Sequence, residues 1–182
     1  ITSYGTGNVP SYFKAENKAG LILEYGNTPD SKVTINGSTI LRWLVNKISD
    51  RYGNYVTFSY NQNSTTGEYY PVQINYTGNA NTGLLPHASM TFEYESRADS
   101  VQRFLSGSKI ANCTQRLKAI KAYYGQKQYR SYTFNYQYNS SNLSELISFQ
   151  ECGLNGSCNT PTTFSWANNA IPTFNVTSLN NI

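Results

Sequence analysis

The candidates for catalysis in this 182-residue chain are one histidine and one pair of glutamates. His87 is the only histidine and follows Pro86 in a loop segment, with no nucleophile evident as a partner nearby. A catalytic base must lie within hydrogen-bond reach of the group it activates. We therefore expect His87 to be a surface residue rather than part of an active site.

Glu93 and Glu95 share one face of an expected strand. Two such residues lie about 7 Å apart, a separation that falls within the range used by the paired carboxylates of glycosidases. Those enzymes usually take their two carboxylates from different elements, and the nearby Arg97 and Lys109 favour surface ion pairs instead. A glycoside hydrolase is therefore the weakest of three functional hypotheses, and no catalytic residue is assigned.

The three cysteines offer one candidate disulfide. Cys152 and Cys158 flank a turn-forming segment, residues 153–157, that could bring the two thiols together. A bridge closing so small a loop would contribute about 2 kcal/mol, but two separate thiols fit the spacing equally well. Cys113 is expected to be unpaired. Three cysteines and one distant histidine lack the paired ligand spacing of a zinc site, so we expect neither a metal nor a cofactor.

Tyrosine is the residue type best suited to binding here, with sixteen copies in the chain. A tyrosine offers a large, rigid contact area with a polar tip, which suits stacking on sugars or a protein interface. The candidate binding residues are Tyr69, Tyr70, Tyr123, Tyr124, Tyr129 and Tyr132. The alternative, which we favour, is that these rings pack across strands within a sheet. A carbohydrate- or protein-binding module is thus the second hypothesis.

Composition indicates an extracellular β protein. Charged residues make up only 13% of the chain, about half of the usual share of roughly 25%. Tyrosine and threonine suit a pleated surface, and asparagine, glycine and serine suit turns. The net charge is +4, but the lysines and arginines are scattered, so we expect no nucleic-acid partner. No stretch approaches the roughly 20 apolar residues of a membrane span.

Alternation of period two predicts strands along most of the chain. Strands are expected at residues 21–25, 39–48, 55–60, 69–76, 88–95, 117–124, 129–138, 146–152 and 162–166. Residues 39–48 also fit a helical face in part, but β-branched neighbours around Trp43 favour a strand. One short helix is expected at residues 97–105, with Val101, Phe104 and Leu105 on one face and Gly107 as its stop. Trp43 and Trp166 are expected to be largely buried.

These elements predict an all-β fold of antiparallel hairpins, arranged as a sandwich or a curved, shell-like sheet, with at most one or two short helices. Residues 1–166 would form the hairpin domain, and residues 167–182 a linker or the start of the next module. Residues 46–60 and 117–136 resemble each other and suggest a hairpin repeated at a spacing near 70 residues. Such a unit buries its face by stacking on neighbouring units.

Several segments, in order along the chain, resemble one family of large bacterial proteins. They are residues 13–26 (FKAENKAGLILEYG), 43–54 (WLVNKISDRYGN), 76–79 (YTGN) and 92–99 (FEYESRAD). This series resembles the SpvB and toxin-complex B-component family. Residues 151–153, Cys158 and residues 161–166 resemble the segment that precedes FG-GAP repeats in such proteins. The turn from Asp50 to Asn54, followed by a tyrosine-containing strand, is similar to the hairpins of Rhs/YD-repeat proteins.

The resemblance implies a non-catalytic scaffold segment. Family members are long exported or surface proteins whose propeller and YD-repeat regions build a hollow shell around a separate toxic region. The implied location is secreted or at the bacterial cell surface, and the implied partners are the rest of the parent polypeptide and a toxin-complex subunit. A glycan or host surface would be the partner under the binding hypothesis. Asp30, Asp50 and Asp99 are too far apart in sequence to form the calcium loops of FG-GAP blades, and no residue here inherits the family's ADP-ribosylating activity.

Overall fold

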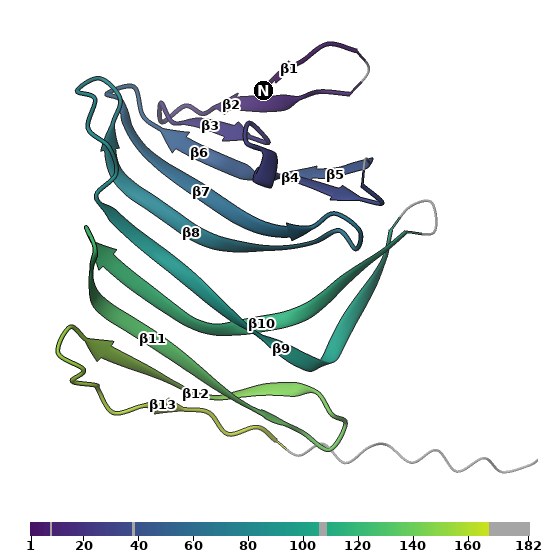
Figure 1. Ribbon diagram of the computed structural model, residues 1–182, viewed down its shortest axis with the longest axis vertical. Helices are drawn as coiled ribbons and strands as arrows, with labels where there is room; N and C mark the ends of the chain where they lie inside the picture. Colours follow the sequence, from purple (N-terminus) through teal and green to yellow (C-terminus); the bar gives the residue numbers. More distant parts are fainter. Residues whose placement is uncertain (8, 38, 106–108, 168–182) are drawn as a thin grey trace, which may run out of the picture.

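The computed structural model describes residues 1–7, 9–37, 39–105 and 109–167. Within these ranges, eleven strands form one large sheet and two strands form a small sheet (Figure 1). The one helical segment in the described residues is a 3-10 turn, η1 (Pro29–Ser31). The predicted all-β, antiparallel class is confirmed. The predicted linker at residues 167–182 lies, apart from Ala167, outside the described residues.

The large sheet is an antiparallel meander interrupted once. Its strands, in spatial order, are β1 (Thr2–Tyr4), β2 (Tyr12–Glu16), β3 (Ile22–Tyr25), β6 (Val45–Ser49), β7 (Asn54–Asn63), β8 (Glu68–Asn79), β9 (Ala88–Leu105), β10 (Lys109–Tyr124), β11 (Lys127–Tyr138), β12 (Ser144–Gly153) and β13 (Thr162–Thr163). The two stretches that resemble each other form the β6–β7 and β10–β11 hairpins. Because consecutive strands are antiparallel, both hairpin turns lie at the same end of the sheet.

The small sheet, β4 (Lys32–Ile35) and β5 (Thr39–Trp43), lies in the connection from β3 to β6. The prediction of a single strand over residues 39–48 is therefore wrong. Leu44 separates β5 from β6 because its backbone N–H donates to Ser31 (2.8 Å) and its carbonyl accepts from Gly26 (2.9 Å). Leu44 is therefore the residue at which the backbone leaves the small sheet and enters the large one.

The small sheet contributes the largest fully buried side chains of the described residues, and η1, directly before it, is tied to β7 by a polar contact. The Asp30 carboxylate accepts a hydrogen bond from the Tyr60 backbone N–H at 2.8 Å. Val33 and Ile35 are only 1% and 2% exposed. Gly67, at φ +70°, lies in the β7–β8 turn beneath the side chains of Leu41 and Ile35, where a Cβ would come within 3.0 Å of Leu41 Cδ1. The positive φ favours glycine at this position, and a Cβ would also crowd the Leu41 side chain.

The helix expected at residues 97–105 does not form, because β9 continues as a strand to Leu105. Four residues, 97–100, lie opposite Thr114 alone, between the pairs Ser96–Gln115 and Val101–Cys113. This large bulge turns β9 through a corner that is visible in Figure 1. Beyond it, residues 101–105 pair with residues 109–113 in a hairpin extension that we call the arm. The predicted stop, Gly107, lies outside the described residues.

The two tryptophans are less buried than expected. Trp43 is half-buried, its ring packs edge-on against Phe13 at 5.1 Å, and its indole N–H donates to the Pro10 carbonyl at 3.2 Å. Trp166 is 52% exposed, and its indole N–H donates to the Leu146 carbonyl at 2.8 Å. Trp166 follows the last strand of the sheet, where no further strand of the described residues covers it. Its predicted burial is wrong.

Candidate functional site

One face of the large sheet is apolar from β3 to β12. Successive residues of this face are either paired across neighbouring strands or separated by two positions on the same strand. Their side chains therefore point to the same side of the sheet. The row runs through Leu23, Ile48, Val56, Phe58, Ile74, Met90, Phe92, Ile120, Tyr132, Phe134 and Phe149. We call this the apolar face. Charged residues appear on this face at one end, where Glu151 lies opposite Tyr132 and forms an ion pair with Arg130 at 2.7 Å.

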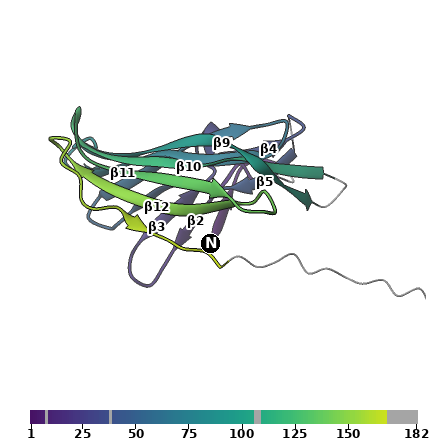
Figure 2. The same cartoon turned by 90° about the horizontal axis from the view of Figure 1, so that it is seen from below.

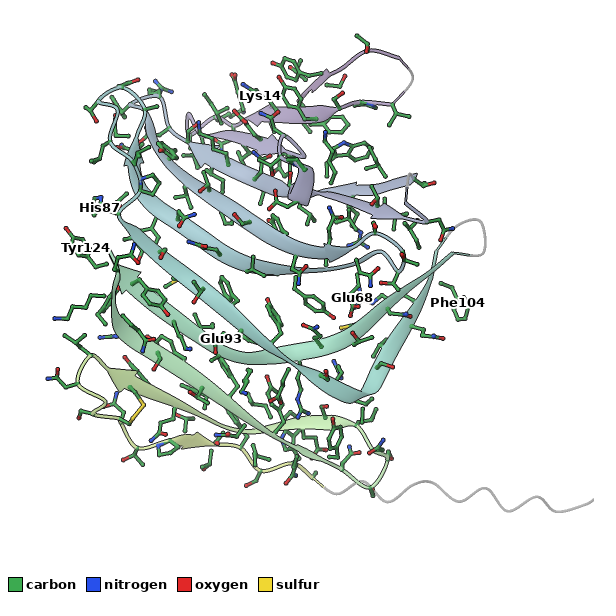
Figure 3. The ribbon with its side chains drawn as sticks, in the orientation of Figure 1. Lys14, Glu68, His87, Glu93, Phe104 and Tyr124 are labelled. Atoms are coloured by element: carbon green, nitrogen blue, oxygen red, sulfur yellow. A yellow bond between two sulfur atoms is a disulfide. The ribbon has the colours of Figure 1, made fainter. Side chains whose placement is uncertain are left out.

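The opposite face is polar along the same strands. Its register row consists of Glu24, Lys47, Thr57, Asn75 and Ser89, continued by Ser59, Gln73, Thr91, Lys121, Ser131, Thr133, Gln150, Asn135 and Ser148. Lys14 on β2 (labelled in Figure 3) forms an ion pair with Glu24 at 3.4 Å. Burial acts to raise the pKa of Glu24, but a hydrogen bond from Asn27 and the charge of Lys14 outweigh it and lower that pKa. The polar and charged side chains of this face suit contact with water.

The apolar face has no second layer of strands or helices over it in the described residues. Figure 2 shows β9 to β12 overlapping as one layer when the sheet is viewed from below. The buried apolar side chains of the described residues are Val33, Ile35, Ala88, Ala119 and Ala122. The large side chains of the apolar face stay half-buried. Because stable domains pack at least two layers around a core, this face is suited to contact with a further layer of protein.

The six candidate tyrosines fall into two groups at opposite ends of the strands. Tyr69 and Tyr70 follow the β7–β8 turn, whereas Tyr123, Tyr124, Tyr129 and Tyr132 lie around the β10–β11 turn. In an antiparallel meander these two turns are at opposite ends of the sheet. The structure therefore does not bring the six rings together into one binding surface.

Tyr70 belongs to a polar network that joins β8 to β10. Its hydroxyl donates to the Glu68 carboxylate and accepts the backbone N–H groups of Thr114 and Gln115, each at 3.1 Å. The Thr114 hydroxyl also donates to Glu68, at 2.9 Å. Burial and then the hydrogen bond to Glu68 raise the pKa of Tyr70 well above its ordinary value. Tyr70 is thus a neutral hydrogen-bonding group that fixes the strand opposite the bulge.

Tyr124 and Tyr129 are the two candidate tyrosines whose rings are open to solvent, at 63% and 40% exposure. His87 is exposed, as expected, and its ring packs edge-on against Tyr124 at 5.2 Å (both labelled in Figure 3). The His87 Nδ1 atom lies 3.0 Å from the Thr77 hydroxyl. These contacts fix the orientation of the imidazole at the edge of the sheet.

Glu93 and Glu95 are each engaged by a cation from β10. Lys121 pairs with Glu93, and Arg116 Nε lies 2.8 Å from Glu95 Oε1. The hydrogen bond that Lys121 donates to the Glu93 carboxylate raises the pKa of Lys121. The sequence predicted ion pairs but assigned a wrong partner, because Arg97 pairs with Asp99; the Lys109 side chain lies outside the described part of the chain.

A buried ionic cluster behind the bulge was missed in the sequence. The Arg97 guanidinium donates two hydrogen bonds to Asp99, at 2.9 and 2.7 Å, and Ser144 at the start of β12 donates its N–H and its hydroxyl to the same carboxylate, both at 2.7 Å. Only 4% of the Asp99 side chain is exposed. The Arg97 contact, then Ser144, hold the pKa of Asp99 far below its usual range. The i, i+2 spacing of Arg97 and Asp99 was the available signal, since it places both on one strand face.

The disulfide candidate is joined in the structure, with an S–S distance of 2.00 Å between Cys152 and Cys158. Cys113 carries a free thiol. After the disulfide, the chain runs back along the outer edge of β12 over residues 157–166, which we call the strap. The strap is attached by backbone bonds from Asn159 N–H to the Glu151 carbonyl and from Phe164 N–H to the Ile147 carbonyl, each 2.9 Å. It occupies the edge of the sheet that another strand would otherwise use.

The described ranges contain no group of three or more histidine, cysteine, aspartate or glutamate side chains arranged to hold a metal ion. They also contain no helix long and apolar enough to cross a membrane.

No known protein family matches the sequence, and no curated protein matches it. Several solved structures share its fold. The N-terminal domain of the effector protein SpvB from Salmonella typhimurium strain LT2 is 12% identical, with a TM-score of 0.66 over 78% of this chain and 61% of that one. The TcdB2-TccC3 crystal structure is 14% identical, with a TM-score of 0.70 over 88% of this chain. The Tc holotoxin pore of Photorhabdus luminescens is 13% identical, with a TM-score of 0.69 over 85% of this chain.

The matched region is a small part of the Tc proteins. This chain spans 11% of the TcdB2-TccC3 chain, 10% of the holotoxin chain and less than two thirds of the SpvB domain. At these identities the likeness is one of fold. The resemblance noted in the sequence is therefore confirmed at that level: the chain has a fold found in toxin-complex proteins and in the SpvB N-terminal domain.

Proposed function

We propose that this chain is a non-catalytic wall segment of a larger secreted protein of the toxin-complex type, located just before an FG-GAP region. The observation that carries the proposal is the amphipathic large sheet, in which a half-buried apolar row from Leu23 to Phe149 lies opposite a polar one. A sheet of this kind separates water on one side from protein on the other. The likeness in fold to part of the TcdB2-TccC3 structure supports the same role.

The partners follow from the two faces. The apolar face would contact the rest of the parent polypeptide or a toxin-complex subunit, and the polar face would meet solvent. The Cys152–Cys158 disulfide supports a secreted or cell-surface location, since disulfides persist in oxidising compartments.

A structural role is also supported by the contacts of the residues that could do chemistry. His87 contacts Thr77 and Tyr124, and the two glutamates, Glu93 and Glu95, are ion-paired to β10. A general acid or base must instead face the atom that it protonates or deprotonates. We expect the chain not to turn over ester, peptide, glycoside or phosphate substrates. Replacing His87, Glu93 or Glu95 should leave assembly of the parent protein unchanged.

Adjacent residues on β9 test the proposal. Phe92 lies on the apolar face and Thr91 on the polar one, so Phe92→Asp and Thr91→Asp place the same charge one position apart on opposite faces. In the full-length parent protein, Phe92→Asp should abolish assembly, measured by size-exclusion chromatography, whereas Thr91→Asp should leave it intact. Equal assembly of both variants, or turnover that depends on Glu93, Glu95 or His87, would refute the proposal.

A further inference from the structure

A cleft of about 220 Å³ lies at the end of the sheet opposite the β10–β11 turn, between β4–β5 and the arm. Its floor is the start of β8, where Glu68 is labelled in Figure 3, and Phe104 on the arm is labelled to the right of it. The volume is below the roughly 300 Å³ at which small-molecule pockets begin. The space therefore suits one or two residues of a chain rather than a cofactor.

The cleft combines apolar walls with free positive charge. Val33 and Leu41 supply the apolar lining, and Arg42 and Arg103 supply two guanidinium groups. Arg42 is positioned by its hydrogen bond to the Tyr69 hydroxyl at 2.8 Å. Arg103 is exposed, and its guanidinium forms no hydrogen bond or ion pair with the described residues.

The one acidic residue in the lining does not cancel this charge, because Glu68 Oε1 already accepts hydrogen bonds from Tyr70 and Thr114. The cleft thus offers guanidinium donors to a ligand while its own carboxylate is engaged within the protein. Arginine pairs most strongly with carboxylates and phosphates, often through two parallel bonds.

A second observation identifies the other half of the ligand. The amide oxygen of Asn112, which lines the cleft, is buried and has no hydrogen-bond partner. Buried acceptors in native proteins are normally paired. A backbone N–H entering the cleft would supply the missing donor, whereas a bare anion would not.

We propose that this cleft binds an extended acidic peptide segment of a partner protein. A peptide N–H donates to Asn112 Oδ1, an aliphatic side chain packs on Val33 and Leu41, and a carboxylate meets Arg103 and Arg42. The site is independent of the wall role, because it lies beside the small sheet and does not use the apolar face.

The chain carries its own reporter for this site. Cys113 lines the cleft and is a free thiol, and the other two of the three cysteines form the disulfide. The rate at which Ellman's reagent modifies the native protein therefore reports on the cleft alone, and a bound peptide will slow it.

The test titrates the protein with an acetylated, amidated pentapeptide of alternating glutamate and valine. The peptide should slow the modification of Cys113, while the same peptide with lysine in place of glutamate should not. Arg103→Ser should raise the apparent Kd about tenfold, the loss expected for one charge-assisted contact. The matched control is Arg51→Ser, an exposed arginine in the β6–β7 turn at the other end of the sheet, which should leave binding unchanged.

Asn112→Ala separates peptide binding from simple anion binding. It should weaken protection by the peptide but leave any effect of acetate or phosphate unchanged. Equal protection by acetate or inorganic phosphate alone, absence of protection by the glutamate peptide, or equal binding by wild type and Arg103→Ser would each overturn the proposal. Because Arg103 is exposed, its variant should keep the circular dichroism spectrum of the wild type.

Discussion

The small sheet and the large sheet bury apolar side chains to very different extents. In the small sheet, two strands pack on β7, and Val33 and Ile35 are almost completely enclosed. In the large sheet, side chains of greater size, such as Phe92 and Phe134, stay half-buried because nothing described lies over them. Burial free energy scales with the area removed from water. The chain therefore buries its large apolar side chains most completely at the small sheet, while the described residues leave its widest apolar surface uncovered.

Ile35→Ala should show the largest effect. Removing most of a fully buried side chain costs roughly 2–5 kcal/mol in the free energy of unfolding, because a cavity remains. Ile35→Val is the matched control and should cost about 0.5–1.5 kcal/mol. Urea unfolding followed by tryptophan fluorescence measures both. A loss below 1 kcal/mol for the alanine variant would mean that the small sheet is not the stabilising unit.

Phe92→Ala should cost less in the isolated chain, although more atoms are removed. A fully buried phenylalanine costs roughly 3–5 kcal/mol on truncation, and half-burial reduces this to about 1–2 kcal/mol. In the parent protein, with the apolar face covered, the cost should rise towards the full value. Equal costs in the isolated chain and in the parent protein would contradict the idea that this face receives another layer.

The alternation of side chains along the chain was sufficient to predict most strands and the antiparallel all-β class, but not the irregularities of the sheet. Val101 and Phe104 fit a helical spacing, but the pairing of residues 101–105 with residues 109–113 overrides that local preference. The break at Leu44 lies inside a continuous apolar stretch, and its cause is two hydrogen bonds to residues distant in sequence, Ser31 and Gly26. The exposure of Trp166 was likewise not predictable from its neighbours in sequence, since it depends on what lies beyond the last strand.

The candidate site was predictable only in its parts. The spacing of Cys152 and Cys158 allowed a disulfide but fitted two separate thiols equally well, and the tyrosines were predicted to lie on strands. The separation of the tyrosines into two ends depends on the strand order, which residue types do not encode. The cleft beside Cys113 brings together β4, β5, β8 and the arm, and no local pattern could place these four elements side by side.

The Arg97–Asp99 cluster makes the bulge of the large sheet sensitive to acid. The pKa of Asp99 is lowered by Arg97 first and by Ser144 next, so its contribution to stability is present above the unfolded value of about 3.9 and is lost as the pH falls below it. Asp99→Asn should therefore narrow the difference in stability between pH 7 and pH 3. The urea unfolding midpoints of both proteins at the two pH values provide the measurement. If wild type and Asp99→Asn lose the same stability between pH 7 and pH 3, the cluster is not the source of the acid sensitivity.

Tyr124→Ala should have the smallest effect on stability, within about 0.5 kcal/mol, because the ring is exposed. The same variant tests the carbohydrate-binding alternative. If the chain has only a structural role, a glycan array probed with the wild-type chain should show no saturable binding. Saturable binding that disappears in Tyr124→Ala, but persists in a Tyr132→Phe control on the apolar face, would establish a second function.

The strap limits how many copies of this sheet can join side by side. Residues 157–166, locked at their start by the Cys152–Cys158 disulfide, occupy the outer edge of β12, whereas β1 has no strand on its outer side among the described residues. A sheet with two open edges can add copies without end and grow into a fibre. With the strap lying along one edge, association through edges should stop at a pair, so we expect a low-charge polypeptide of this kind to keep a finite size in solution.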